Sequence, residues 1–266
     1  MKLSKLAAWG GMVGPLLFTA AWAISSLRQP GHAATEVQLS GLAAEEAQDP
    51  QIMTAAFVVL GACSIGFGAA LRRVAGPRSA GPGLVMTAGA MAVAAGVFRR
   101  DHMLLTGPGF AGESWHNQVH DIVSGVAYAA MLAAPLELGR RFRADPDWAG
   151  LARPVQFLTL SSAAAMVLFS SRAVEPWNGV VQRAAVTLAV AAEVVIATRM
   201  LAAPPNGSRK KPVTTPATAP CRRSPPAPED VAALSALSNG SSRWKRRRWS
   251  YAGRPGSAAL GRPQFR

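Results

Sequence analysis

The chain has 266 residues, of which 50% are hydrophobic and only 16% are charged, against roughly 25% charged residues in soluble domains. This deficit argues against a soluble domain and for a protein that folds in a membrane. The formal net charge of +14 is concentrated after residue 202, where thirteen Lys and Arg stand against Glu229 and Asp230. Cys63 lies in an apolar run and Cys221 in a polar segment, which argues against a disulfide-stapled secreted fold.

Six apolar stretches are long enough, or nearly so, to cross a bilayer as helices, since a hydrocarbon core about 30 Å thick needs roughly 20 residues. These stretches comprise residues 6–27, 52–71, 81–98, 121–138, 155–171 and 179–201. The first is longer than the apolar core of a cleaved signal peptide, so we expect it to be a retained span. The sequence therefore predicts an all-α polytopic membrane protein, a six-helix transmembrane bundle over residues 1–202.

Small residues recur at helical spacing in these stretches, as at Gly10 and Gly14 in the first. Small side chains allow two membrane helices to approach closely. The pair is consistent with packing inside one chain and with a homodimer face, so the oligomeric state stays open.

The loops between the stretches alternate in charge. Basic residues gather before the first stretch, between the second and third, and between the fourth and fifth; they are Lys2, Lys5, Arg72, Arg73, Arg78, Arg140, Arg141, Arg143 and Arg153. Positive loops remain on the cytoplasmic side of a membrane. The composition, rich in Ala, Gly, Pro and Arg, fits a bacterium with a GC-rich genome. We therefore expect a multi-pass protein of the bacterial cytoplasmic membrane with both termini in the cytoplasm.

Polar side chains gather between the third and fourth stretches, on the predicted outer face. His116 and His120 are four residues apart, so both imidazoles project from one face if the fourth helix begins a turn early. Such a pair can bind a metal ion, and Asp101 or Asp121 can supply an oxygen ligand or fix a histidine tautomer. The alternative, which we prefer, is a structural cluster in which the Asp101 carboxylate contacts an imidazole and ties the two helix ends together.

Glu193 is the acidic residue placed well inside a predicted span. An ionisable group at that depth is by default a functional candidate, with a partner or water beside it. The competing interpretation places Glu193 nearer the interface, where it pairs with Arg199. Both interpretations stay open at the level of the sequence.

Residues 203–266 change in character, because Pro, Ser, Ala and Arg dominate and Trp244-Lys245-Arg246-Arg247-Arg248-Trp249 forms a basic cluster. This composition cannot bury a core, so we predict a basic disordered cytoplasmic tail. The cluster can attract anionic lipid head groups, at about 1 kcal/mol per basic residue. We expect no specific nucleic-acid partner, and a solvated tail without a dedicated role remains an equal alternative.

Several short motifs occur in a set order along the predicted spans. They are Gly14-Pro15-Leu16-Leu17-Phe18, Ser40-Gly41-Leu42, Gly61, Phe98 with Asp101, and the segment from His116 to Ser124. In this order they resemble the domain of unknown function 998 family of multi-pass prokaryotic membrane proteins, over about residues 5–200. Arg99-Arg100 departs from the Pro often found there in the family. The resemblance implies a six-span bundle without an established activity, with Asp101 and His120 at the family's outer polar positions.

The sequence itself names no activity, and it shows no phosphate-cradling loop, nucleophile elbow or Cys-x-x-Cys pair. The leading interpretation is an uncharacterised integral membrane protein whose outer Asp/His cluster orders the mouth of the bundle. A proton-coupled transporter or carrier would need a polar path from that cluster to Glu193. A metal-dependent membrane hydrolase acting on lipid would need a third ligand near His116 and His120. Whether the protein is an enzyme, and with which cofactor, is left open.

Overall fold

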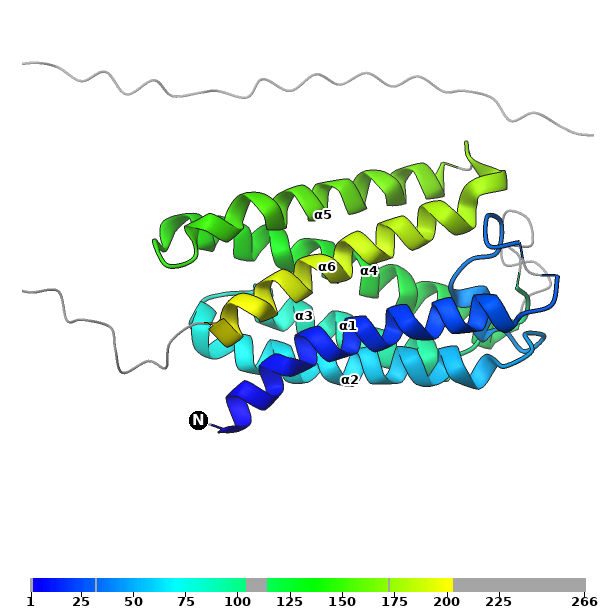
Figure 1. Cartoon of the computed structure of the whole chain (residues 1–266), viewed down its shortest axis with the longest axis horizontal. Helices are drawn as coiled ribbons and strands as arrows, with labels where there is room; N and C mark the ends of the chain where they lie inside the picture. The colour runs from blue at the N-terminus through cyan, green and yellow to red at the C-terminus, as the bar shows by residue number, and fades with distance from the viewer. Residues whose placement is uncertain (1, 32, 104–113, 172, 203–266) are drawn as a thin grey trace, which may run out of the picture. The chain divides into compact units, whose positions relative to one another are not determined.

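The computed structural model describes residues 2–31, 33–103, 114–171 and 173–202, and these residues form helices and connecting segments without a strand (Figure 1). In chain order the elements are α1 (Lys2–Arg28), η1 (Ser40–Ala43), α2 (Pro50–Ala75), α3 (Gly81–Val97), α4 (Trp115–Ala144), α5 (Ala149–Ser170), η2 (Glu175–Trp177) and α6 (Asn178–Ala202). The predicted all-α bundle is confirmed. The predicted tail, residues 203–266, lies outside the described residues.

The helices extend the predicted spans at their ends. α4 begins at Trp115 rather than at residue 121, because Ser114 caps its first turn: the Ser114 hydroxyl oxygen accepts the backbone N–H of Asn117 at 3.2 Å. α2 begins with Pro50. Proline is tolerated there because a backbone N–H in the first turn of a helix has no acceptor within the helix. The early start of α4 places both histidines of the predicted pair inside the helix.

The six helices form a closed ring, since each packs against the next and α6 returns to α1 (Figure 1). Among the described residues, five helices are long and apolar enough to cross a membrane, and α3 is a shorter apolar helix of 17 residues. At 1.5 Å rise per residue α3 is about 25 Å long. These lengths and compositions indicate a multi-pass membrane protein.

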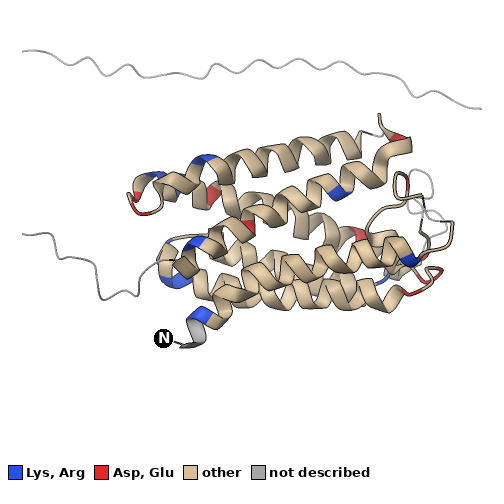
Figure 2. Ribbon diagram, in the orientation of Figure 1, with Lys and Arg blue, Asp and Glu red and all other residues tan. Residues whose placement is uncertain are grey.

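The two ends of the ring differ (Figure 1). The described parts of the segments that join α1 to α2, α3 to α4 and α5 to α6 lie at one end, here called the long-loop end (Figure 1). Residues 76–80 and 145–148 join the other helices at the opposite, short-loop end. Lys and Arg gather at the short-loop end, whereas most Asp and Glu of the connecting segments lie at the long-loop end (Figure 2). The charge alternation read from the sequence thus separates the two ends of the ring.

Glycines set the closest approaches between neighbouring helices. A Cβ atom at Gly61 would lie 2.3 Å from the carbonyl oxygen of Gly89, so α2 and α3 are in backbone contact there. A Cβ atom at Gly10 would lie 2.7 Å from the carbonyl oxygen of Cys63, and one at Gly14 would lie 2.7 Å from the Cys63 Cβ. Gly10 and Gly14 therefore pack α1 against α2 within one chain, and they do not leave a free face for a second copy.

Two apolar clusters fill the ring toward its ends. The cluster near the short-loop end includes Phe67, Leu71, Leu138, Phe142, Trp148 and Ile196. The cluster near the long-loop end includes Phe18, Leu39, Leu42, Met53 and Leu60. Within the first cluster the rings of Phe142 and Trp148 stack with their centroids 4.9 Å apart. The interior between the two clusters is not filled.

Candidate functional site: a cavity inside the helix ring

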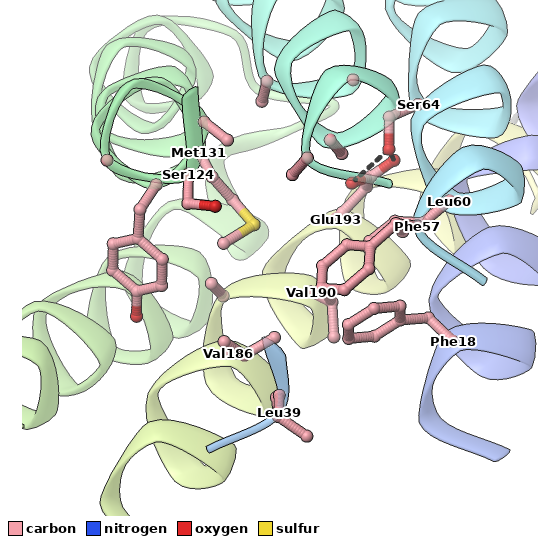
Figure 3. A pocket seen from close by; sticks show the side chains of 18 of the residues that line it. Phe18, Leu39, Phe57, Leu60, Ser64, Ser124, Met131, Val186, Val190 and Glu193 are labelled. Carbon is pink, nitrogen blue, oxygen red and sulfur yellow. Dashed lines mark hydrogen bonds between the residues drawn. The ribbon is translucent and has the colours of Figure 1, made fainter. Parts of the chain in front are cut away.

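A cavity of about 380 Å³ lies inside the ring. All six helices line it, together with the segment 38–40 and Arg100. Its wall is mostly apolar and includes Phe18, Phe57, Leu60, Phe67, Tyr128, Met131, Val186 and Val190 (Figure 3). This volume lies in the range of cavities that hold drug-sized small molecules.

The cavity is elongated along the bundle. On α6 the lining residues recur at helical spacing from Gln182 through Val186, Val190 and Glu193 to Ile196. At 1.5 Å rise per residue this face of α6 extends about 21 Å. The backbone N–H of Leu39, at the long-loop end, donates to Gln182 Oε1 at 2.7 Å. The cavity therefore runs from the long-loop end past Glu193, as far as Phe67 of α2 and Ile196 of α6.

Glu193 is the carboxylate in the deeper part of the cavity, and its side chain contacts Ser64 of α2 (Figure 3). The Ser64 hydroxyl lies 3.0 Å from Oε1 and 3.2 Å from Oε2, and it donates to the carboxylate. None of the ion pairs between described residues involves Glu193. Arg199 donates from Nε and Nη2 to the carbonyl oxygen of Asp147, at 3.2 Å and 2.7 Å. The interpretation in which Glu193 pairs with Arg199, left open by the sequence, is therefore wrong.

The depth of Glu193 gives its charge a large cost. The residue lies nine positions before the end of α6 at Ala202, which corresponds to about 14 Å along the helix. An ionised carboxylate without a cationic partner is expensive in such surroundings. The group can relieve this cost by taking up a proton or by contacting a cation in the cavity. A molecule that enters the cavity and displaces water will therefore change how readily Glu193 holds a proton.

Arg100 is the basic side chain of the cavity wall, at the long-loop end, and only 2% of it is exposed. Its Nε donates to Asn117 Oδ1 at 3.4 Å, and its Nη1 donates to Gln38 Oε1 at 3.0 Å. Its backbone carbonyl accepts the N–H of Glu45 at 3.1 Å. Sequence reasoning did not assign Arg100 to the site. The one available signal was its departure from the family pattern next to an apolar stretch.

His120 joins the start of α4 to the end of α3. It is 1% exposed, and its Nδ1 lies 2.9 Å from the carbonyl oxygen of Ala95 and 2.7 Å from that of Phe98. Because carbonyl oxygens only accept, Nδ1 carries the proton and donates to both. His116, one turn earlier, is exposed and packs against the rings of Trp115 and Phe98.

Asp101 is tied to the cap of α4. Its carboxylate accepts the Ser114 hydroxyl at 2.6 Å and the Ser114 backbone N–H at 2.7 Å. These two bonds hold the pKa of the Asp101 carboxyl below its usual range. Ser114 thus links the end of α3 to the start of α4, and among the described residues the hydrogen bonds of the Asp101 carboxylate are with Ser114 and not with an imidazole. His120 instead uses backbone carbonyls, which the helix end leaves without partners of their own.

The proposed metal ligands Asp101, His116 and His120 have separate surroundings. Asp101 is hydrogen-bonded to Ser114, His116 is exposed, and His120 donates to backbone carbonyl oxygens. Over the part of the chain that the structure describes, no group of three or more His, Cys, Asp and Glu side chains could hold a metal ion. The metal assignment stays a prediction that metal analysis of the purified protein can test.

Comparison with known proteins identifies one family. A family model described as "Protein of unknown function (DUF998)" matches residues 12–199, which include most of each of the six helices. No curated protein matches the chain, and no solved structure matches it. The family match confirms the resemblance that the short motifs predicted.

Proposed function

Since the chain belongs to this family, whose description assigns no activity, we propose from the geometry that the protein carries a small amphipathic molecule across the bacterial cytoplasmic membrane, coupled to protonation of Glu193. One observation supports this proposal: the cavity inside the ring connects polar groups at the long-loop end with a carboxyl group at mid-helix depth. Carriers commonly bind their substrates near the midplane, between helices.

The wall of the cavity indicates the character of the ligand. Apolar side chains from every helix of the ring leave few places for hydrogen bonds, so most of a bound molecule must be apolar. Polar groups occur at the long-loop end, at Arg100, and in the deeper part of the cavity, at the pair of Ser64 and Glu193. Five residues of the family motifs also line the cavity; they are Phe18, Ser40, His120, Asp121 and Ser124. These features favour binding of a ligand over a purely structural bundle.

The orientation in the membrane is part of the proposal. The basic side chains at the short-loop end favour a cytoplasmic location for that end (Figure 2). α1 begins there and α6 ends there (Figure 1), so both termini are proposed to be cytoplasmic. The long-loop end then faces outward, with the hydrogen bonds of Arg100, Asn117 and His120 ordering the mouth of the bundle. No observation favours the alternative of a metal-dependent hydrolase.

The first experiment tests whether the cavity binds ligands. The full chain, purified in lipid nanodiscs, is titrated with the apolar fluorescent probe N-phenyl-1-naphthylamine. Ala88→Phe places a ring on a residue that lines the cavity, whereas Ala90→Phe places the same ring on an exposed residue two positions away on α3. We expect Ala88→Phe to lose most of the saturable fluorescence and Ala90→Phe to keep it. Equal saturable binding in both variants would overturn the proposal.

The second experiment tests the coupling to protons. Proton uptake on addition of the same probe is measured with a pH electrode in weakly buffered solution, over a series of starting pH values. The wild type should take up as much as one proton per bound probe at some pH, because the probe displaces water from Glu193. Glu193→Gln should insert and bind the probe but take up none. Glu36→Gln, in an exposed loop, is the control that should behave like wild type. Uptake that persists in Glu193→Gln contradicts the coupling.

A further inference from the structure

Two arginines are buried among the described residues, and they have different partners. Arg183 donates from Nη1 to the carbonyl oxygens of Ala34 and Val37, both at 2.8 Å, and from Nη2 to the Ser26 hydroxyl at 3.3 Å. Arg183 does not line the cavity. It fastens the segment after α1 to α6, so its burial has a structural explanation.

Arg100 lacks such a set of partners. The hydrogen bonds of its guanidinium reach two side-chain amide oxygens, those of Asn117 and Gln38, through Nε and Nη1. A guanidinium has five N–H groups, and it stays charged in proteins. In the described part of the chain no ion pair forms at Arg100. Glu193 can lose its charge by taking up a proton, but Arg100 cannot. The cavity wall therefore contains a buried positive charge without an ion-pair partner among the described residues, and a bound anion would supply that partner.

We propose that Arg100 is the recognition site for the anionic head group of a single-chain amphiphile, of the class of long-chain carboxylates, whose apolar chain occupies the cavity toward Glu193. The inference rests on the proposed function and adds the substrate class to it. A carboxylate matches the planar fork of a guanidinium and can accept two parallel hydrogen bonds from it. The remaining N–H groups of Arg100 supply these donors.

The shape of the cavity favours one chain rather than two. Its long dimension is about 21 Å along α6 from Gln182 to Ile196, and apart from Gln182 and Glu193 the α6 side chains that line it are apolar. A volume of about 380 Å³ suits a drug-sized molecule, and a phospholipid with two chains, each long enough for half a bilayer, would exceed it. Once Glu193 has taken up a proton, as the proposed coupling requires, its carboxyl group is neutral and the apolar chain of the ligand can lie beside it.

Asp121 is the other acidic residue of the cavity wall, near the same end. Asn117 links it to Arg100, because Asn117 Nδ2 donates to Asp121 Oδ2 at 3.4 Å while Asn117 Oδ1 accepts from Arg100. The negative charge of Asp121 opposes the binding of an anion at short range. Asp121→Asn should therefore strengthen the binding of a carboxylate, whereas removal of the Arg100 charge should weaken it.

The test compares head groups on one chain length. Decanoate, decanol and decylammonium displace N-phenyl-1-naphthylamine from the full-length protein in nanodiscs, and the cavity-blocked Ala88→Phe variant corrects for partition into lipid. The wild type should prefer decanoate over decanol by about tenfold to a hundredfold, as expected for a hydrogen-bonded charge pair. Arg100→Gln should reduce this ratio to about one, and Arg100→Lys should leave an intermediate ratio. Asp121→Asn should raise it.

Arg183→Gln is the matched control, since it removes the other buried arginine without touching the cavity wall. Arg183→Gln should lower stability while its folded fraction keeps the wild-type preference for decanoate. The inference is overturned if Arg100→Gln and wild type prefer decanoate equally, or if decylammonium binds best and Glu193→Gln abolishes that preference. If no decyl compound displaces the probe, the proposed function itself fails. If all three displace it equally well, the carrier proposal stands and the head-group site fails.

Discussion

Replacing His120 with alanine removes the side chain that joins the end of α3 to the start of α4. The buried imidazole donates from Nδ1 to the carbonyl oxygens of Ala95 and Phe98, at 2.9 Å and 2.7 Å. Hydrogen bonds between membrane helices contribute about 0.6 kcal/mol each on average. The ring also packs edge-on against Phe57, with centroids 6.3 Å apart.

The expected cost follows from these contacts. Because both carbonyl oxygens share the one N–H of Nδ1, this hydrogen bonding contributes about 0.6 to 1.2 kcal/mol. Loss of a buried ring next to an existing cavity adds a packing penalty at the low end of the range for large-to-small substitutions, so the total is about 2 to 3 kcal/mol. His116→Ala is the matched control four residues earlier, because that side chain is exposed and should cost less than about 0.5 kcal/mol.

The measurement is the free energy of unfolding in mixed micelles titrated with SDS, together with the metal content of each purified variant. His120→Ala should unfold at clearly lower SDS than His116→Ala, and the two variants should contain the same amount of metal as wild type. Equal stability of the two variants would refute the structural role of His120. A stoichiometric metal in wild type that disappears in both variants would refute it in favour of a metal site.

Three further predictions concern packing, acid stability and topology. Gly61→Val should cost about 1 to 3 kcal/mol in the same SDS assay, because a Cβ there would lie 2.3 Å from the Gly89 carbonyl oxygen; an unchanged midpoint would exclude the close approach. The lowered pKa of Asp101 means that its carboxylate stabilises the fold at pH values above its usual range and loses this effect as pH falls through the lowered pKa. Asp101→Asn should therefore be less stable than wild type at neutral pH and equally stable in strong acid, and a difference independent of pH would speak against this. Arg78→Cys and Glu113→Cys, in a chain without other cysteines, should react with an impermeant reagent from opposite sides of the membrane. Labelling of both in intact cells contradicts the alternation.

The six helices could be predicted from the sequence because a bilayer offers no water to backbone N–H and C=O groups. A long apolar stretch must then form a helix that satisfies its own backbone. The predicted stretch 179–201 became α6 (Asn178–Ala202) within one residue at each end. The stretch 121–138 was less accurate, because the start of α4 is set by the Ser114 cap rather than by hydropathy.

Residue types pointed correctly to Glu193 as an unusual group, since a carboxylate inside an apolar span stands out in any sequence. They could not identify its partner, because Ser64 lies 129 positions away along the chain. Arg100 was missed for the same reason. Nothing local distinguishes an arginine that is exposed at a helix end from one that is buried against Gln38 and Asn117.

The sequence by itself thus determined the helices, the charge difference between the two ends and the family, all of which depend on local composition or on short motifs. The tertiary structure decided which side chains face the interior of the ring. Closure of α6 against α1 brings one face of each helix together around a common cavity. That closure depends on close contacts between the backbones of neighbouring helices, such as the contact between α2 and α3 at Gly61 and Gly89. Hydropathy along the chain does not show which face of each helix turns toward the interior of the ring, because lipid and the interior of a membrane protein are both apolar.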